Sequence, residues 1–285
     1  MPFSHRLAII ATGVIIRIGL FLNKTQRRKR MKVGIRDGML GLPLDQTFSK
    51  VSQIGFDGIE VCMGVDYRNH LIWQDGGVDQ LKALSKGHNL EIPSLSPGGF
   101  TAFTFAHPQD SVRSEGIAML QRLIEVAPEL GSKVILVPFF GNAEIKREDL
   151  KSARFIDGWK VVAGTAEKFD VQLGIESTID ATDHQFIIDQ VDSTSIGVYY
   201  DMGNATTFGY DSVQEIHQLG NAIVQMHIKE TGGNHPGEGD VDFPAVIEAT
   251  RKINYDGWLV LETPAKEDAI VSAIRNMNFV RENYG

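Results

Sequence analysis

Four side chains that bind divalent metal ions each stand at the end of a short apolar run. Glu176 follows VQLGI, Asp201 follows IGVYY, His227 follows IVQM, and Glu262 follows GWLVL. Three carboxylates and one imidazole suit one divalent ion such as Mn²⁺, Co²⁺, Mg²⁺ or Zn²⁺. A structural zinc site would instead close a tetrahedron with Cys and His ligands. The residue types therefore predict one metal ion bound where four strands end.

Each of these residues has a plain alternative explanation when it is taken alone. A strand-end carboxylate can be a solvated charge, and His227 can be a hydrogen-bonded core histidine. The coincidence on four successive strands favours a shared site. Three carboxylates also exceed the charge of a divalent ion, which makes sense if one of them is also a base or if a substrate hydroxyl loses its proton there.

The elements that must position these residues alternate between strands and helices. After Met31, short β-branched runs alternate with longer amphipathic stretches such as Gly116 to Leu130. The predicted strands are nearly continuous in apolar residues, as expected when both faces are buried. They cover residues 32–37, 58–63, 91–96, 133–139, 171–177, 196–202, 223–229 and 257–263. Eight such pairs predict an α/β fold, a single-domain (β/α)8 TIM barrel with its chemistry at the carboxyl ends of the strands.

Length and composition agree with one globular enzyme domain. The chain has 285 residues, of which 42% are hydrophobic and 22% charged, and barrels of about 250 residues are routinely single domains. Cys62 is the only cysteine, so an intrachain disulfide is impossible and a reducing, cytoplasmic location is expected. The glycine-rich nucleotide motifs GxGxxG and GxxxxGK[ST] are absent from the sequence.

The first 30 residues differ from the rest of the chain. The run from Leu7 to Leu22 is apolar except for Arg17 and precedes the basic stretch NKTQRRKR. It could be a membrane-proximal leader, an interfacial amphipathic anchor, or translated sequence upstream of the true start. We favour the last, because Met31 immediately precedes the first predicted strand. The expected division is an extension of residues 1–30 outside the fold and a barrel of residues 31–285, with membrane association not expected.

Charge restricts the partners of the barrel. Residues 1–30 hold seven basic and no acidic residues, which leaves 21 basic against 36 acidic residues in the remainder, a balance of about −15. Such a body repels a polyphosphate backbone but tolerates a divalent cation or a small chelated ligand. We therefore expect a small molecule and no nucleic acid as partner.

The motifs of the last third resemble a known family. From about Lys32 to Tyr284 the chain resembles the sugar phosphate isomerases and epimerases of the xylose-isomerase-like TIM barrel superfamily, of the ketose 3-epimerase or L-ribulose-5-phosphate 3-epimerase type. The resemblance is strongest in GIEST, YYDMGNA, MHIKET, PGEGDVDF and GWLVLE. Inosose dehydratases, hydroxypyruvate isomerases and an apurinic endonuclease belong to the same class, so these motifs specify the superfamily better than the substrate.

The resemblance implies a metal-dependent isomerase of carbohydrate metabolism. On this chain it implies that Glu176, Asp201, His227 and Glu262 bind one metal ion and that Glu176 and Glu262 are the acid–base pair. A chelated ketose has an acidified C–H, because a metal stabilises the developing enediolate. Two carboxylates on opposite faces of that plane would invert a carbon centre, so C3 epimerisation of a ketose or ketose phosphate is the leading reaction. One base serving two carbons on the same face would interconvert an aldose and a ketose instead.

Two residues near the ligands are candidates for substrate binding. Lys229 lies two positions beyond His227 and shares its face of the strand, so it could hold a substrate oxygen or a phosphate; otherwise it is a surface lysine. Asn204 follows Asp201 in DMGN, where some members of the family have a histidine. This difference argues against a histidine role there and leaves a hydrogen-bonding one.

Four further candidates come from positions in other loops. Glu238 lies in the segment PGEG, which borders the active site in the family, although the segment could equally be a tight turn before a helix capped by Asp242. Glu60 ends GIEV and resembles a substrate-contacting position, with a strand-end charge as the alternative. Arg36 and His70 could reach the mouth of the barrel from the first two loops.

The same residues leave three functions other than epimerisation to consider. A dehydratase of a keto-polyol, of the inosose dehydratase type, could use the same metal and base to start a β-elimination. An endonuclease is disfavoured by Asn204 at the expected histidine position and by the acidic body. A non-catalytic sugar-binding barrel would not need both Glu176 and Glu262. The family resemblance also suggests a homodimer or homotetramer.

Overall fold

The computed structural model describes residues 30–284. Residues 1–29, which make up nearly all of the expected N-terminal extension, lie outside the described residues. The division of the chain at residue 31 therefore stays a prediction.

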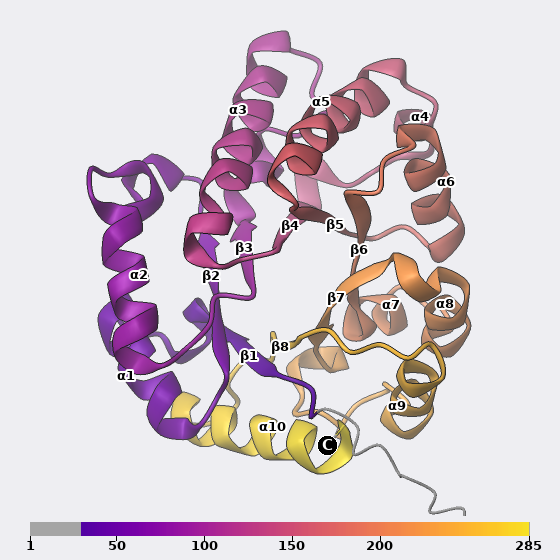
Figure 1. Ribbon diagram of the computed structural model, residues 1–285. Coiled ribbons are helices and arrows are strands. Elements are labelled where there is room, and N and C mark those ends of the chain that lie inside the picture. The colour runs from indigo at the N-terminus through magenta and orange to yellow at the C-terminus, as the bar shows by residue number, and fades with distance from the viewer. Residues whose placement is uncertain (1–29, 285) are drawn as a thin grey trace, which may run out of the picture.

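Eight parallel strands form a closed barrel in which each strand pairs with its neighbours in chain order, and β8 pairs with β1 (Figure 1). The strands are β1 (Val33–Arg36), β2 (Gly58–Met63), β3 (Ser94–Pro97), β4 (Val134–Phe139), β5 (Gln172–Ser177), β6 (Ile196–Asp201), β7 (Ile223–Ile228) and β8 (Leu259–Leu261). The expected (β/α)8 TIM barrel is thus confirmed.

Helices surround the barrel on the outside (Figure 1). They are α1 (Leu44–Ile54), α2 (Gly77–His88), α3 (Asp110–Val126), α4 (Arg147–Leu150), α5 (Ala153–Phe169), α6 (Ala181–Val191), α7 (Met202–Thr207), α8 (Ser212–Leu219), α9 (Phe243–Lys252) and α10 (Ala269–Tyr284). Their apolar faces and the outer faces of the strands form one hydrophobic core. Within residues 30–284, none of these helices combines the length and the apolar character needed to cross a bilayer.

Several predicted boundaries were wrong, and two of them lie near a proline. The third strand starts at Ser94 rather than residue 91, and Glu91 makes only an isolated bridge to Gly58. Pro93 lies between Glu91 and Ser94 and has no N–H to donate to the neighbouring strand. The helix predicted from Gly116 to Leu130 is α3, which starts earlier, at Asp110. It ends at Val126, and Pro128 begins a separate 3₁₀ turn.

A polar layer fills the barrel interior below the strand ends. Tyr199, Gln225 and Ser94 are at most 1% exposed, and Tyr199 and Gln225 lie two positions before Asp201 and His227 on their strands. Because side chains alternate along a strand, each pair shares one face. The residues below the strand ends therefore point into the barrel.

Gly174 on β5 provides the space that Tyr199 occupies. A Cβ atom at Gly174 would lie 2.9 Å from Cβ of Tyr199, 3.0 Å from Cγ2 of Val224 and 3.1 Å from the backbone nitrogen of Tyr199. These neighbours belong to β6 and β7, so they cannot move aside without shifting the barrel wall. A residue without a side chain is required here.

Alanine substitutions at two glycines test this packing. Gly174→Ala should lower the free energy of unfolding by about 1–3 kcal/mol, because the added methyl overpacks the barrel wall. Gly164→Ala in α5, where an added Cβ meets no atom within 4 Å, should raise it by about 0.5–1 kcal/mol. Urea unfolding followed by circular dichroism measures both. Equal effects of the two variants would contradict the assigned role of Gly174.

Candidate metal centre

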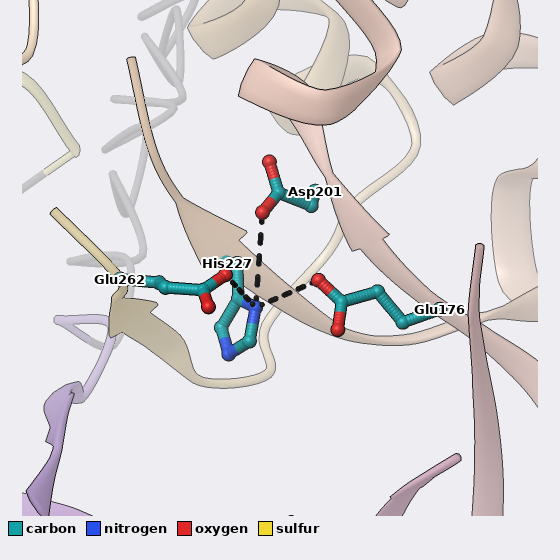
Figure 2. Close-up of side chains that lie close together, drawn as sticks. All are labelled: Glu176, Asp201, His227 and Glu262. Carbon is teal, nitrogen blue, oxygen red and sulfur yellow. Dashed lines mark hydrogen bonds and ion pairs between the residues drawn. The ribbon is translucent and has the colours of Figure 1, made fainter. Parts of the chain in front are cut away.

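The four predicted ligands converge at the carboxyl ends of four adjacent strands. Glu176, Asp201, His227 and Glu262 each offer one ligand atom, and these atoms all lie within 4.8 Å of one another. Nδ1 of His227 is 3.1 Å from Oε1 of Glu176, 3.1 Å from Oε2 of Glu262 and 3.9 Å from Oδ2 of Asp201. Figure 2 shows the three carboxylates around this nitrogen, with Glu262 to the left and Glu176 to the right in this view.

The register of the barrel explains this convergence. Asp201 is the partner of His227 in the pairing of β6 with β7, and the backbone N–H of Glu262 donates to the carbonyl of Ile228, 3.1 Å away, at the end of β7. Asp201 is also the N-cap of α7, since its Oδ1 accepts from the backbone N–H of Asn204 at 2.8 Å. The cap fixes the carboxylate and leaves Oδ2 facing His227.

One oxygen of Asp201 indicates that the site fits a metal ion. Oδ2 of Asp201 is buried and accepts no hydrogen bond from any described residue. The closest cation among its ion pairs is Nζ of Lys229, at 3.6 Å. Buried carboxylate oxygens are normally satisfied, so this atom is available as a ligand. Together with the other two carboxylates and Nδ1 of His227, it gives the oxygen-rich donor set that Mn²⁺, Co²⁺ and Mg²⁺ prefer and that Zn²⁺ accepts.

The ionisable groups of the cluster influence one another strongly. Burial alone lowers the pKa of His227, but the carboxylates of Glu60 and Glu176 outweigh it and raise this pKa to about 9. Burial raises the pKa of Asp201, and the charge of Glu176 adds to this effect against the opposing charge of Lys229. His227 without an ion is therefore an imidazolium that neutralises part of the acidic cluster.

Three of the six expected substrate-binding residues line the pocket beside the ligands. Arg36 pairs with Glu262, and Nζ of Lys229 is 3.3 Å from Oε2 of Glu262. Nδ2 of Asn204 donates to Oε1 of Glu176 at 3.4 Å. The pocket is lined by Arg36, Ser96, Gly98, Thr101, Leu136, Pro138, Phe140, Glu176, Asn204, Lys229 and Glu262.

The other three expected contacts do not line this pocket. Glu60 has no exposed surface, and its Oε1 is 3.3 Å from Nε2 of His227, so it points below the ligands rather than into the pocket. Burial alone would raise the pKa of Glu60, but His227 and Arg36 lower it to about 2. His70 caps the 3₁₀ turn Leu71–Trp73, where its Nδ1 accepts from the backbone N–H of Ile72 at 3.3 Å.

Glu238 lies in a loop whose backbone is hydrogen-bonded to another carboxylate, that of Glu230. Glu230 is buried and accepts from the backbone N–H groups of Gly237 and Val241, each at 3.1 Å. Glu238 itself pairs with Arg275 of α10. The alternative explanation of this segment, a turn before a helix, matches the structure, since Asp242 caps α9 by accepting from the backbone N–H of Ala245 at 3.1 Å.

Sequence reasoning missed the residues that lie below the ligands. Ser94, Tyr199 and Gln225 are polar residues inside apolar strands, and all three are hydrogen-bonded to one another or to Glu60. The sequence signal that could have found them is the alternation of side chains along a strand, by which every second residue faces the same side. Tyr199 and Gln225 each precede a predicted ligand by two positions, which places them on the same inward face.

The charge state of His227 predicts that metal binding depends on pH. A metal ion must displace the Nδ1 proton, so affinity for Co²⁺ should rise about tenfold per pH unit while the pH stays below about 9. Isothermal titration calorimetry in buffers of different ionisation enthalpy should detect about one proton released per ion bound. An affinity that does not change between pH 6 and pH 8, without proton release, would contradict this charge state.

Relatives of known sequence match along most of the barrel. The chain is 25% identical to the uncharacterized protein MJ1311 of Methanocaldococcus jannaschii, over 85% of this chain and 87% of that protein. It is also 25% identical to L-ribulose-5-phosphate 3-epimerase UlaE of Shigella flexneri, over 80% of this chain and 85% of that enzyme.

Solved structures and a family model agree on the fold. D-psicose 3-epimerase of Clostridium cellulolyticum H10 superposes with a TM-score of 0.77 at 19% identity, over 89% of this chain and 99% of that one. The 3-keto-D-glucoside 4-epimerase YcjR of E. coli superposes with a TM-score of 0.74 at 20% identity, over 89% of this chain and 100% of that one. The model of the xylose isomerase-like TIM barrel family matches residues 48–282, and the chain therefore belongs to that family.

Proposed function

We propose that the protein is a divalent-metal-dependent sugar epimerase whose leading reaction is C3 epimerisation of a ketose or ketose phosphate. One observation carries the proposal: Glu176 on β5 and Glu262 at the end of β8 approach Nδ1 of His227 from two different strands, each at 3.1 Å (Figure 2). Two carboxylates placed in this way can address both faces of one carbon. The match to L-ribulose-5-phosphate 3-epimerases supports the same reaction type.

The four ligands divide the work between binding and proton transfer. Asp201 and His227 do not line the pocket and would hold the ion, whereas Glu176 and Glu262 both line the pocket and would also meet the substrate. A bound Mn²⁺, Co²⁺, Mg²⁺ or Zn²⁺, held by these four residues, would supply Lewis-acid chemistry to the sugar. Glu176 and Glu262 can thus act on a carbon next to the sugar carbonyl.

Proton transfer from C3 to one glutamate and from the other glutamate to C3 would invert the carbon. One carboxylate removes the proton from C3 and becomes neutral, leaving a planar enediolate. The other, which starts protonated, delivers its proton to the opposite face and becomes ionised. The two glutamates exchange these states when the reaction runs in the other direction, so both epimers are accepted by one site.

Residues around each base would orient it and the substrate. Arg36 and Lys229 hold Glu262, and Asn204 holds Glu176. Because Arg36, Lys229 and Asn204 also line the pocket, we infer that they bind sugar oxygens, with the two cations also suited to a phosphate. Leu136, Pro138 and Phe140 line the same pocket with apolar surface, which would keep water from the planar intermediate.

The proposed partner is a small sugar or sugar phosphate. The acidic balance of the chain beyond residue 30 disfavours nucleic acid as a substrate. Assembly as a homodimer or homotetramer and a cytoplasmic location stay predictions of the sequence.

Replacing either base should stop proton exchange. Glu176→Gln and Glu262→Gln should each reduce incorporation of solvent deuterium into ketoses or ketose phosphates by about 10²–10⁴-fold, because glutamine cannot accept the proton. Mass spectrometry of the recovered sugar measures the exchange and also separates epimerisation from elimination, which yields a deoxy product. Glu248→Gln on the outer surface of α9 is the matched control. Undiminished exchange in both base variants would refute the two-base mechanism.

Removal of the ion should stop turnover reversibly. A chelator should abolish activity on the substrate found by the exchange assay, and added Mn²⁺ or Co²⁺ should restore it, because the ligands stay in place on the barrel strands. Circular dichroism before and after chelation shows whether the fold persists. A chelated, metal-free protein with full activity would refute the metal assignment.

A further inference from the structure

Glu60 places a fully buried carboxylate directly below the ligands. It lies on β2, is 0% exposed, and has four neighbours with nitrogen or oxygen donors directed at it. Oε2 accepts from Tyr199 at 2.6 Å and from Ser94 at 2.7 Å. Oε1 is 3.2 Å from Nε of Arg36 and 3.3 Å from Nε2 of His227. An ionised carboxylate, which only accepts, is the group that satisfies all four.

Gln225 fixes the direction of these hydrogen bonds. Its amide Nε2 donates to Oγ of Ser94 at 2.7 Å and to the hydroxyl of Tyr199 at 2.8 Å. Each hydroxyl therefore already accepts one bond and turns its own proton toward Glu60. The network runs one way, from Gln225 through the two hydroxyls to the carboxylate.

The network also determines which nitrogen of His227 keeps its proton when a metal ion displaces the other one. Because Oε1 of Glu60 is an acceptor, Nε2 of His227 must be the donor. The neutral imidazole then has its lone pair on Nδ1, the nitrogen that faces Glu176, Asp201 and Glu262 (Figure 2). The ring of Tyr199 packs against the imidazole with centroids 4.4 Å apart and holds its plane.

We propose that Glu60 is a positioning residue that acts through His227, holding the imidazole in the Nε2–H tautomer with Nδ1 directed at the metal ion. This inference rests on the proposed metal site. Glu60 touches no ligand other than His227, but Arg36 links it to Glu262, since Arg36 contacts Oε1 of Glu60 and pairs with Glu262. The buried carboxylate thus orients one ligand directly and a second through a guanidinium.

Metal affinity of two Glu60 variants tests the proposal. Glu60→Gln keeps an oxygen that can accept from His227, whereas Glu60→Leu removes every acceptor. Loss of a carboxylate partner behind a histidine ligand typically weakens metal binding about 10–100-fold. We expect calorimetric titration with Co²⁺ to show a smaller loss of affinity for Glu60→Gln and a larger loss for Glu60→Leu. If the leucine variant does not fold, the affinity of Glu60→Gln alone tests the proposal.

Glu215→Gln provides the matched control. Glu215 is a buried carboxylate that accepts from a tyrosine, Tyr200 at 3.1 Å, and from the backbone N–H of Ala181 at 2.8 Å, and it bonds to none of the four ligands. Its loss should lower thermal stability and leave Co²⁺ affinity unchanged. An equal loss of Co²⁺ affinity in Glu215→Gln and Glu60→Gln would overturn the proposal. Removing any buried carboxylate would then weaken metal binding, whether or not it contacts His227.

The tautomer itself is a second measurement. In the zinc-loaded protein, ¹⁵N-resolved NMR of the histidine side chains should show a protonated Nε2 on His227, and this signal should weaken or shift in the Glu60 variants. Wild-type affinity and an unchanged His227 signal in both variants would overturn the role of Glu60 alone. Failure of the wild-type protein to bind Co²⁺ or Zn²⁺ would overturn the proposed metal-dependent function, and this inference with it.

Discussion

A buried negative charge in the middle of the barrel constrains the structure around it. Removing a carboxylate such as Glu60 from water costs several kcal/mol unless charges and hydrogen bonds compensate. Here Arg36, Ser94, Tyr199 and His227 all compensate it, from β1, β3, β6 and β7. Strands on opposite sides of the barrel are therefore tied to one group, and Gly174 is small because Tyr199 must reach that group.

The barrel mouth has two halves with different roles. Strands β5 to β8 supply the four candidate ligands, whereas β1 supplies Arg36 and the loop after β3 supplies uncharged polar groups such as Thr101. Glu60 connects the halves, because it bonds to Arg36 on one side and to His227 on the other. The half that supplies the candidate ligands and the half that supplies Arg36 thus share one buried carboxylate, Glu60.

Much of the fold and the cluster of four candidate ligands could be predicted from the sequence, because both depend on local patterns. Apolar runs define strands, and Glu176, Asp201, His227 and Glu262 end four of them. Whether a polar side chain outside this cluster faces the pocket depends on contacts between distant segments, which the sequence of a single strand does not reveal. Glu60 was expected at the substrate and lies below the ligands, and Glu238 was expected beside the pocket but pairs with Arg275.

The two candidate bases, Glu176 and Glu262, differ in their surroundings. This difference matters because the proposed reaction requires each of them to remove a proton in one direction and to deliver one in the other. Glu262 contacts two cations, Arg36 and Lys229, whereas Glu176 contacts the neutral amide of Asn204. A histidine at position 204 would add to the pocket a side chain that titrates near neutral pH, whereas asparagine does not titrate. No described residue that lines the pocket is a histidine. Glu176 and Glu262 are the two carboxylates among the described residues that line the pocket, and the proposed reaction places the moving protons on them.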